Sequence, residues 1–255
     1  VADKLGSFND GTNNGWTFVA AHASRKLGKL LPGAELELLY IHTDRDSAPA
    51  AVFVGERDTL SARLAGTAGK FAYDVELVGQ HGSIRSTGEQ VRAWFVGTDA
   101  AWQLPGPLSP RIGLRADIGS GDRLANDGTS NTYDFLWSRG QTYTPELGYS
   151  NLISAGPSFG FKPGSRWTAE GVVQGLWRTS KADGLYNLVN VMIRSANQGN
   201  SRYVGLRTTA RIEYQVDRFL SLGLYVNRTL AGSFLKEAGE GKSLFYSTTY
   251  ATLRF

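Results

Sequence analysis

Arginines that alternate with apolar residues are the side chains of this sequence best suited to chemistry. In the segments that begin at Arg111 and Tyr203, all the charged side chains fall on one face, and the other face is mostly aliphatic. A guanidinium presents a planar fork of donors that fits a carboxylate or a phosphate, and the chain uses 19 Arg against 8 Lys. The chemistry indicated is therefore the binding of anions. The candidate binding residues are Arg63, Arg92, Arg115, Arg178, Arg207 and Arg211, with Asp74, Glu76, Asp117 and Glu213 expected to position the guanidiniums.

The same residues have a second interpretation. Arginines and carboxylates on one face of a sheet can pair across strands and stiffen it, at about 0.2 to 1 kcal/mol per pair. Further members of the charged set are Arg111, Arg254, Glu35, Glu37 and Glu170. The residue pattern leaves both interpretations open.

Catalytic motifs are weak in this sequence. Residues 156–160 match the G-x-S-x-G pattern of hydrolases, but that pattern needs a strand, a sharp turn and a helix, whereas a Pro-Gly turn and another alternating segment follow here. The histidines His22, His42 and His81 fall on three different segments. We expect neither an enzyme nor a cofactor.

Oxygen donors gather in the longest connection. Asp122, Asp127 and Asp134 are calcium candidates, although their spacing is not that of an EF-hand. We expect a solvated loop there rather than a metal site.

The composition excludes several classes of protein. The chain has 255 residues, of which 41% are hydrophobic and 20% charged, so it is too apolar to be disordered. A net charge of +4 is too small for a dedicated nucleic-acid binder. No stretch reaches the roughly 18 to 20 apolar residues of a transmembrane helix. A transmembrane β-barrel stays possible, because its strands need only about 9 to 11 residues of alternating polarity.

Segments with a period of two run through the whole chain and predict strands. The expected strands are 16–25, 34–43, 58–67, 71–80, 90–102, 111–119, 152–162, 167–179, 203–216, 219–230 and 244–255. Burying Arg115 or Arg211 in a soluble sandwich core would cost several kcal/mol each unless it were paired, so their face must meet water. The opposite, apolar face would then meet lipid.

Short and long connections alternate along the chain, as in an up-and-down outer-membrane barrel with tight periplasmic turns and long outer loops. We expect all 255 residues to form one such barrel domain. If the short turns are periplasmic, the first segment runs inward and residues 1–15 form an outer loop. We then expect N-terminal strands to be missing, unless part of residues 1–15 supplies one more strand. The connection around residues 185–193 is unusually apolar. We expect it to extend a strand above the membrane rather than to fold into the lumen as a constriction.

Two regions resemble the alginate-export family of bacterial outer-membrane barrels. The first includes Thr-Leu-Ser-Ala-Arg-Leu-Ala-Gly at 59–66, Phe-Ala-Tyr-Asp-Val-Glu at 71–76 and Gln-His-Gly at 80–82. The second includes Ile-Gly-Ser-Gly-Asp at 118–122, Tyr-Asp-Phe-Leu-Trp at 133–137 and Tyr-Ser-Asn at 149–151. The resemblance covers residues 58–163, with weaker similarity onward to 255. It implies an eighteen-stranded, monomeric barrel whose Arg-rich lumen lets an acidic polysaccharide leave the cell, so about 11 to 12 C-terminal strands would be present here.

We therefore predict an all-β, antiparallel, up-and-down transmembrane barrel in the bacterial outer membrane. It would pass anionic polysaccharide or small acidic solutes through a lumen lined by the candidate residues above. Its expected partners are outer-membrane lipid, the solute and periplasmic export components. Two alternatives are a general or nutrient-uptake porin on the same scaffold and a soluble all-β glycan-binding module.

Overall fold

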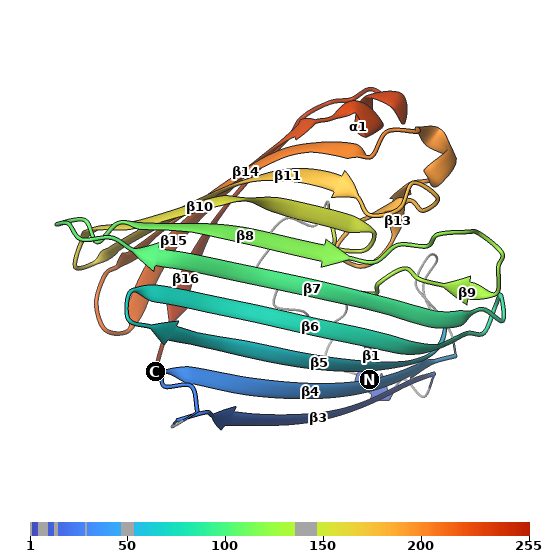
Figure 1. The fold of residues 1–255 in the computed structure, drawn as a ribbon, viewed down its shortest axis with the longest axis horizontal. Coiled ribbons are helices and arrows are strands. Elements are labelled where there is room, and N and C mark those ends of the chain that lie inside the picture. Colours follow the sequence, from blue (N-terminus) through green and yellow to red (C-terminus); the bar gives the residue numbers. More distant parts are fainter. Residues whose placement is uncertain (1, 5–9, 13–14, 29, 47–53, 136–146) are drawn as a thin grey trace.

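A computed structural model describes residues 2–4, 10–12, 15–28, 30–46, 54–135 and 147–255, and these fold almost entirely as antiparallel strands (Figure 1). The main sheet has 12 strands. Its path runs through β3 (Trp16–Lys26), β4 (Ala34–Arg45), β5 (Gly55–Ala68), β6 (Phe71–Ile84), β7 (Gln90–Gln103), β8 (Arg111–Gly119), β10 (Leu152–Gly164), β11 (Trp167–Arg178), β14 (Tyr203–Gln215), β15 (Leu220–Ala231) and β16 (Leu244–Leu253). The short β9 (Thr129–Ser130) pairs in parallel with β7, off this path.

Each of the expected strand segments overlaps one long strand of this path, and consecutive strands are neighbours in the sheet. The prediction of an all-β, up-and-down, barrel-type fold is therefore confirmed. In the part of the chain that the structure describes, β3 and β16 are the two edges of the sheet. A single domain that forms the C-terminal part of an eighteen-stranded barrel stays a prediction.

The remaining elements are short. β1 (Ala2–Lys4) pairs with β2 (Asp10–Thr12), and β12 (Leu185–Tyr186) pairs with β13 (Met192–Arg194), each in a sheet of two strands. A 3-10 turn η1 (Ala196–Gln198) and helix α1 (Ser233–Glu237) lie in the last two long connections. Among the described residues, no helix has the length and apolar character needed to cross a membrane.

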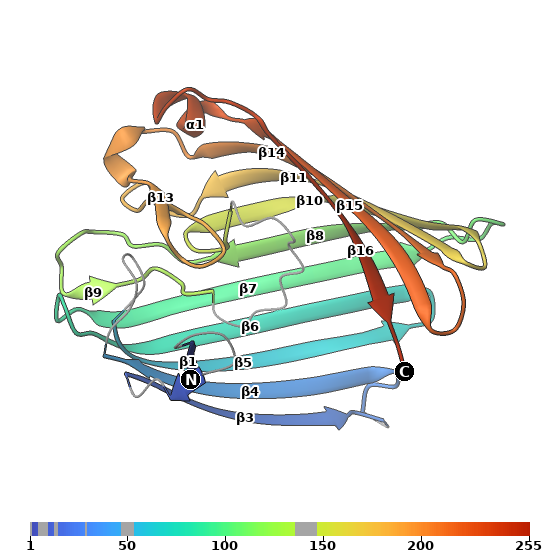
Figure 2. The ribbon, with the colours of Figure 1, turned by 180° about the vertical axis from the view of Figure 1, so that it is seen from behind.

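The longest connections all lie at one end of the strands, as Figure 1 shows, and every connection at the other end has seven residues or fewer. We call the end with the short connections, such as 69–70 between β5 and β6, the turn end, and the other the loop end. The sheet also curls over itself, so that β16 passes behind the central strands in Figure 1 and in front of them in Figure 2. The curl gives the sheet an inside and an outside.

Cross-strand register fixes which residues share a face. Glu37 lies opposite Arg63, and Arg63 lies opposite Glu76. Further along the sheet, Glu170 lies opposite Arg211. Because side chains directly opposite each other project to the same side, these charges share one face, which we call the charged face.

The charged face is the inside of the curl. Arg115 of β8 interacts electrostatically with Tyr225 of β15, which lies four strands away in the sheet order. Such a contact requires the two parts of the sheet to face each other. The polar side chains therefore line the concave side of the sheet.

The opposite face is apolar and exposed. Leu114 of β8 is 56% exposed and Leu60 of β5 is 59% exposed, although both lie in the middle of a sheet. The large apolar side chains exposed on this apolar face include Leu38, Leu77, Trp94, Trp102, Phe159, Trp167, Trp177, Ile212, Leu222, Leu224 and Phe245. No protein core covers this surface among the described residues.

Two apolar clusters cover the loop end of the charged face. The first joins Val78, Val91 and Phe95 of the sheet to Tyr133 and Tyr149 of the longest connection, with the rings of Phe95 and Tyr133 stacked at 5.1 Å. The longest connection thus packs inward over β6 and β7. The sequence does not predict this covering, because these apolar residues share a face with the arginines.

The second cluster joins Leu152 and Leu176 of the sheet to Leu185 of β12 and Phe234 of α1. Here the expectation of a strand extension at residues 185–193 is wrong, since β12 and β13 pair with each other and extend no strand of the main sheet. Leu185 is apolar because this separate hairpin buries it against Leu152 and Leu176.

Candidate functional site

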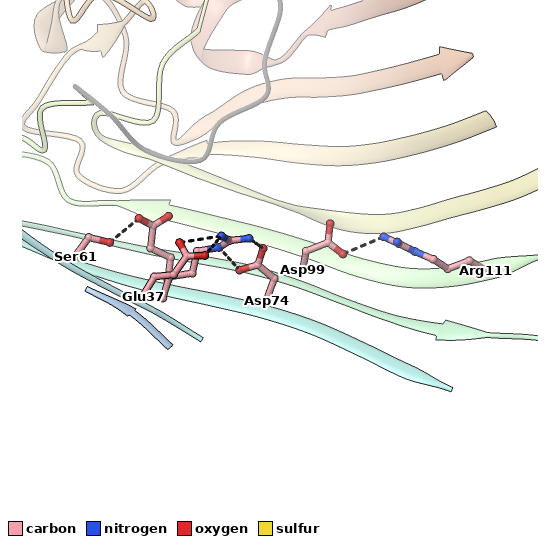
Figure 3. A network of polar contacts seen from close by, with 7 residues as sticks. Glu37, Ser61, Asp74, Asp99 and Arg111 are labelled. Atoms are coloured by element: carbon pink, nitrogen blue, oxygen red, sulfur yellow. Dashed lines mark hydrogen bonds and ion pairs between the residues drawn. The ribbon is translucent and has the colours of Figure 1, made fainter. Parts of the chain in front are cut away.

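Arg63 is the centre of the best-formed polar network on the charged face (Figure 3). Its Nη2 lies 2.8 Å from Oδ2 of Asp74, and its Nε lies 3.0 Å from Oδ1, which makes the contact bidentate. Its Nη1 donates to Glu37 at 3.1 Å. Glu76, directly opposite Arg63, instead accepts a 2.7 Å hydrogen bond from Ser61. Arg63 is thus held by two carboxylates and still keeps about a third of its side chain exposed.

A second group lies beside it on β7 and β8. Arg111 Nη2 lies 3.4 Å from Oδ1 of Asp99, and Figure 3 shows Arg111 reaching toward this carboxylate from the turn end. Arg115 Nε lies 3.6 Å from Oδ2 of Asp117, which is almost fully buried. Asp99 is a site residue that was not predicted. The alternation along β7 indicates its place on the charged face, because it lies two residues from Gly97, which is opposite Asp117.

Arg211 forms a third group on the far part of the sheet. Its Nη2 donates to Glu213 at 2.6 Å, and its Nε donates to the Tyr250 hydroxyl at 2.8 Å. The Tyr250 hydroxyl also donates to Glu213 at 2.8 Å. The Tyr250 ring lies over Gly223, where a Cβ would come within 2.1 Å of the ring. Arg211, Glu213 and Tyr250 therefore form a triangle in which each side chain is hydrogen-bonded to the other two, and the Tyr250 ring packs directly over Gly223.

Arg92 lies on the apolar face, which corrects the prediction that it lines the lumen. Its cross-strand partner is His81, and its neighbours Val91 and Ala93 are the residues that point inward, both buried. The cause is the longest connection, which covers the inner face of β7 and requires apolar residues there. The polarity of β7 is consequently reversed at its loop end.

Arg178 is fully buried, which corrects its assignment to a water-filled route. Its side chain donates to the backbone carbonyl oxygens of Ser201, Gly199 and Asp183 at 2.8 to 3.2 Å. The guanidinium also lies 3.8 Å from the centre of the Phe234 ring. Arg178 therefore fastens the connections around α1 to the end of β11.

Arg207 faces inward, opposite Gln174 and Thr229, but is only 4% exposed. Its Nε and Nη2 have no hydrogen-bond partner among the atoms of the structure. Burial at the loop end separates it from the three accessible groups around Arg63, Arg115 and Arg211. Arg254 follows β16 at the turn end, close enough to Glu213 for electrostatic interaction.

Arg57 is an inward arginine that the sequence analysis missed. It belongs to β5, where Arg57, Thr59, Ser61 and Arg63 alternate, but the expected strand begins one residue later. Arg57 Nη1 donates to Gln80 at 3.0 Å and lies 3.6 Å from Oδ2 of Asp134. The alternation of polar residues could have identified it.

The calcium candidates do not converge. Asp122 Oδ1 accepts from the Asn131 backbone N–H, Asp127 Oδ1 accepts from that of Thr129, and Asp134 lies against Arg57. Burial raises the pKa of Asp122 above its ordinary value. Within the described ranges, no group of three or more His, Asp or Glu side chains could hold a metal ion.

Part of the second motif region lies outside the described residues, namely 136–137. No curated protein matches the chain. The family model described as alginate export matches residues 10–246, which is nearly the whole chain. The sheet, its charged inside and its exposed apolar outside agree with this match, and the chain belongs to the alginate-export family.

Proposed function

We propose that the protein forms a pore in the bacterial outer membrane through which an acidic polysaccharide leaves the cell. The observation that carries the proposal is the division of one curled sheet into a charged inside and an exposed apolar outside. Water must meet Arg63 and Arg211, and lipid tails would cover Leu60 and Leu114. Passage through such a pore requires no bond to be made or broken.

The width of the apolar band supports a place in the membrane. Trp167 and Trp177 bound the apolar face of β11, ten residues apart, which is about 33 Å along a strand. With the usual tilt of roughly 40°, this corresponds to a band about 25 Å tall. The ring of Trp167 lies 4.6 Å from that of Tyr214 at the turn end, and the ring of Trp177 lies 5.9 Å from that of Tyr203 at the loop end. Two aromatic rows of this kind are typical of the two membrane interfaces.

The accessible arginines support an anionic solute of low charge density. Arg63, Arg111, Arg115 and Arg211 each lie near a carboxylate, so the inside combines guanidinium donors with a moderated field. A polyuronate could exchange contacts with successive guanidiniums without being trapped by one of them. Arginines without a neighbouring carboxylate would bind the polymer more tightly and hold it in place.

Conductance across a planar bilayer tests the proposal. We expect the full protein to conduct, to prefer anions and to be blocked by oligouronates. The double variant Arg115→Ala, Arg211→Ala should lose the anion preference, because it removes two of the accessible guanidiniums. The outer-face variant Arg228→Ala is the control and should behave as the wild type, since Arg228 lies exposed opposite Thr208 on the apolar face.

Two outcomes would contradict the proposal. Conductance without ion preference in the wild type would favour the general or nutrient-uptake porin. A monomeric protein that stays in water without detergent would favour the glycan-binding module. The exposure of Leu60 and Leu114 argues against this module, because a water-soluble sandwich would bury such residues. We further propose that the pore is monomeric and receives the polymer from periplasmic export components.

A further inference from the structure

A row of polar side chains crosses the apolar face of β4 to β7 close to the loop end. The residues are His42, Asp58, His81 and Arg92, and each lies directly opposite the next across neighbouring strands. Further toward the turn end, the same face of these four strands carries large apolar residues such as Leu38, Leu60 and Leu77. Charged and polar groups on such a face need an explanation, since lipid tails cannot hydrogen-bond them.

Asp58 is already held from the β4 side of this row. Its Oδ1 accepts a 2.6 Å hydrogen bond from the Tyr40 hydroxyl and lies 2.9 Å from Nδ1 of His42. The carboxylate nevertheless stays 45% exposed, so it can accept a further hydrogen bond.

Arg92 ends the row with a guanidinium that is free to bind. The side chain is exposed, and no ion pair or side-chain hydrogen bond of its guanidinium occurs among the described residues. Its backbone is fixed, because the Arg92 carbonyl oxygen accepts a 3.0 Å hydrogen bond from Asn131. Arg92 and His81 together present donors that suit a phosphate.

A shallow open groove lies next to this row, one step further into the apolar band. Its floor is Gly79, and its sides are Leu60 and Trp94, which lie opposite Gly79 on the two neighbouring strands. A Cβ placed on Gly79 would meet nothing within 4 Å. The missing side chain thus leaves a notch between two large apolar residues, and an acyl chain fits this shape.

We propose that this surface binds a phosphorylated membrane glycolipid, with the phosphate at Arg92 and His81, a sugar hydroxyl at Asp58, and an acyl chain in the notch above Gly79. The three parts of the surface match the three chemical parts of such a lipid in the order in which a membrane presents them. The inference rests on the proposed place of the protein in a membrane. It concerns the outer face and not the route of the polysaccharide.

Lipid A, an acylated and phosphorylated sugar, is the probe for the experiment. The purified protein in detergent is titrated with lipid A, and the bound lipid is measured by native mass spectrometry. We expect Arg92→Ala to weaken binding by roughly five-fold or more, which corresponds to the loss of one lipid-facing cation. The matched control is Arg228→Ala, an exposed arginine on the same face that belongs to β15 and does not line the groove next to Arg92.

A second variant tests the notch separately. Gly79→Leu fills the groove without a backbone contact, so the fold should be kept. We expect it to weaken lipid A binding and to leave any weak binding of inorganic phosphate unchanged. Equal lipid A binding by the wild type and Arg92→Ala would overturn the proposal. So would displacement of lipid A by millimolar inorganic phosphate, which would show a free-ion site.

Conductance separates this inference from the proposed function. Arg92→Ala should conduct as the wild type does, because Arg92 lies on the face opposite Arg63. An intact pore with unchanged lipid binding in Arg92→Ala would overturn only the lipid site. A wild-type protein that binds lipid A but forms no pore would overturn only the export function.

Discussion

Arg63 lies directly opposite Glu76 of β6 but forms its ion pair with Asp74, which lies two residues further toward the turn end on the same strand. Glu76 accepts a hydrogen bond from Ser61 at Oε1 instead, so both carboxylates make diagonal contacts, while the buried Glu76 Oε2 has no hydrogen-bond partner among the described residues. Arg63 therefore lies between Asp74 and Glu37, two carboxylates against one guanidinium, and its edge stays open to the concave side of the sheet. Each of these charges has a known sign and position, so the direction in which a single substitution changes the local charge can be predicted.

Arg63→Ala should shift the ion selectivity toward cations, and Asp74→Asn should shift it toward anions. At roughly 8 Å in water, one unit charge changes the energy of a passing ion by about 0.5 kcal/mol, or roughly two-fold in the permeability ratio. Reversal potentials in a salt gradient measure the change. Shifts of the same sign in both variants would contradict the assignment of this face to the ion path.

Arg178→Ala should destabilise the loop end. The substitution removes a buried guanidinium and leaves the carbonyl oxygens of Ser201, Gly199 and Asp183 without their donor. We expect a loss of about 3 to 5 kcal/mol in the free energy of unfolding. Thermal unfolding in detergent and limited proteolysis within residues 180–202 measure it.

Arg194→Ala is the control for this substitution. Arg194 lies in β13 of the same region, but its side chain is exposed and donates only to the neighbouring Ile193 carbonyl oxygen. Its replacement should change the unfolding temperature little. Equal effects of the two substitutions would show that Arg178 does not fasten these connections.

The strands were predictable because one period governs the whole chain. In β8, Ile112, Leu114 and Ile118 alternate with Arg111 and Arg115, and both the strand and its two faces follow from that spacing. The family match could likewise be anticipated from local motifs. Neither the strand prediction nor the family prediction depends on contacts between distant segments.

The errors at Arg92 and Arg178 share a cause that does depend on such contacts. Both residues lie at the loop end, where long connections pack onto the inside of the sheet. In β7 this packing requires Val91 and Phe95 to face inward, so an apolar inside replaces the polar one. Alternation fixes which residues share a face, but only the fold decides which face is covered.

Gly223→Ala should disturb the triangle of Arg211, Glu213 and Tyr250. A methyl group at Gly223 would lie 2.1 Å from the Tyr250 ring, so the ring must move and its two hydrogen bonds must lengthen. We expect a cost of about 1 to 3 kcal/mol in the free energy of unfolding.

A double-mutant cycle isolates this contact. In a Tyr250→Ala background the ring is absent, so Gly223→Ala should cost no more than about 0.5 kcal/mol. Tyr250→Phe keeps the ring and should lose only about 1 kcal/mol, for the hydrogen bonds of the hydroxyl. An equal cost of Gly223→Ala in both backgrounds would place the effect in the backbone rather than in the ring.

Acid should release α1 from the connection before β14. Glu237 accepts hydrogen bonds from the Ser201 hydroxyl and from the backbone N–H groups of Ser201 and Asn200, at 2.9 and 2.7 Å for the two N–H groups. These donors hold the pKa of Glu237 below its ordinary value. A carboxylate with a lowered pKa stabilises the folded state fully above its unfolded pKa of about 4.3, and the contribution disappears as the pH falls through the lower, folded pKa.

Cleavage by an acid-active protease between pH 5 and pH 2 measures this release. In the wild type we expect residues 196–203 to become sensitive as the pH falls below about 4. Glu237→Gln should be more sensitive at pH 5 and show a flatter profile, because the amide does not titrate in this range. Glu240→Gln is the control, since Glu240 lies exposed beside Lys242 and should leave the profile unchanged. A wild-type profile in Glu237→Gln would assign the acid sensitivity to another carboxylate.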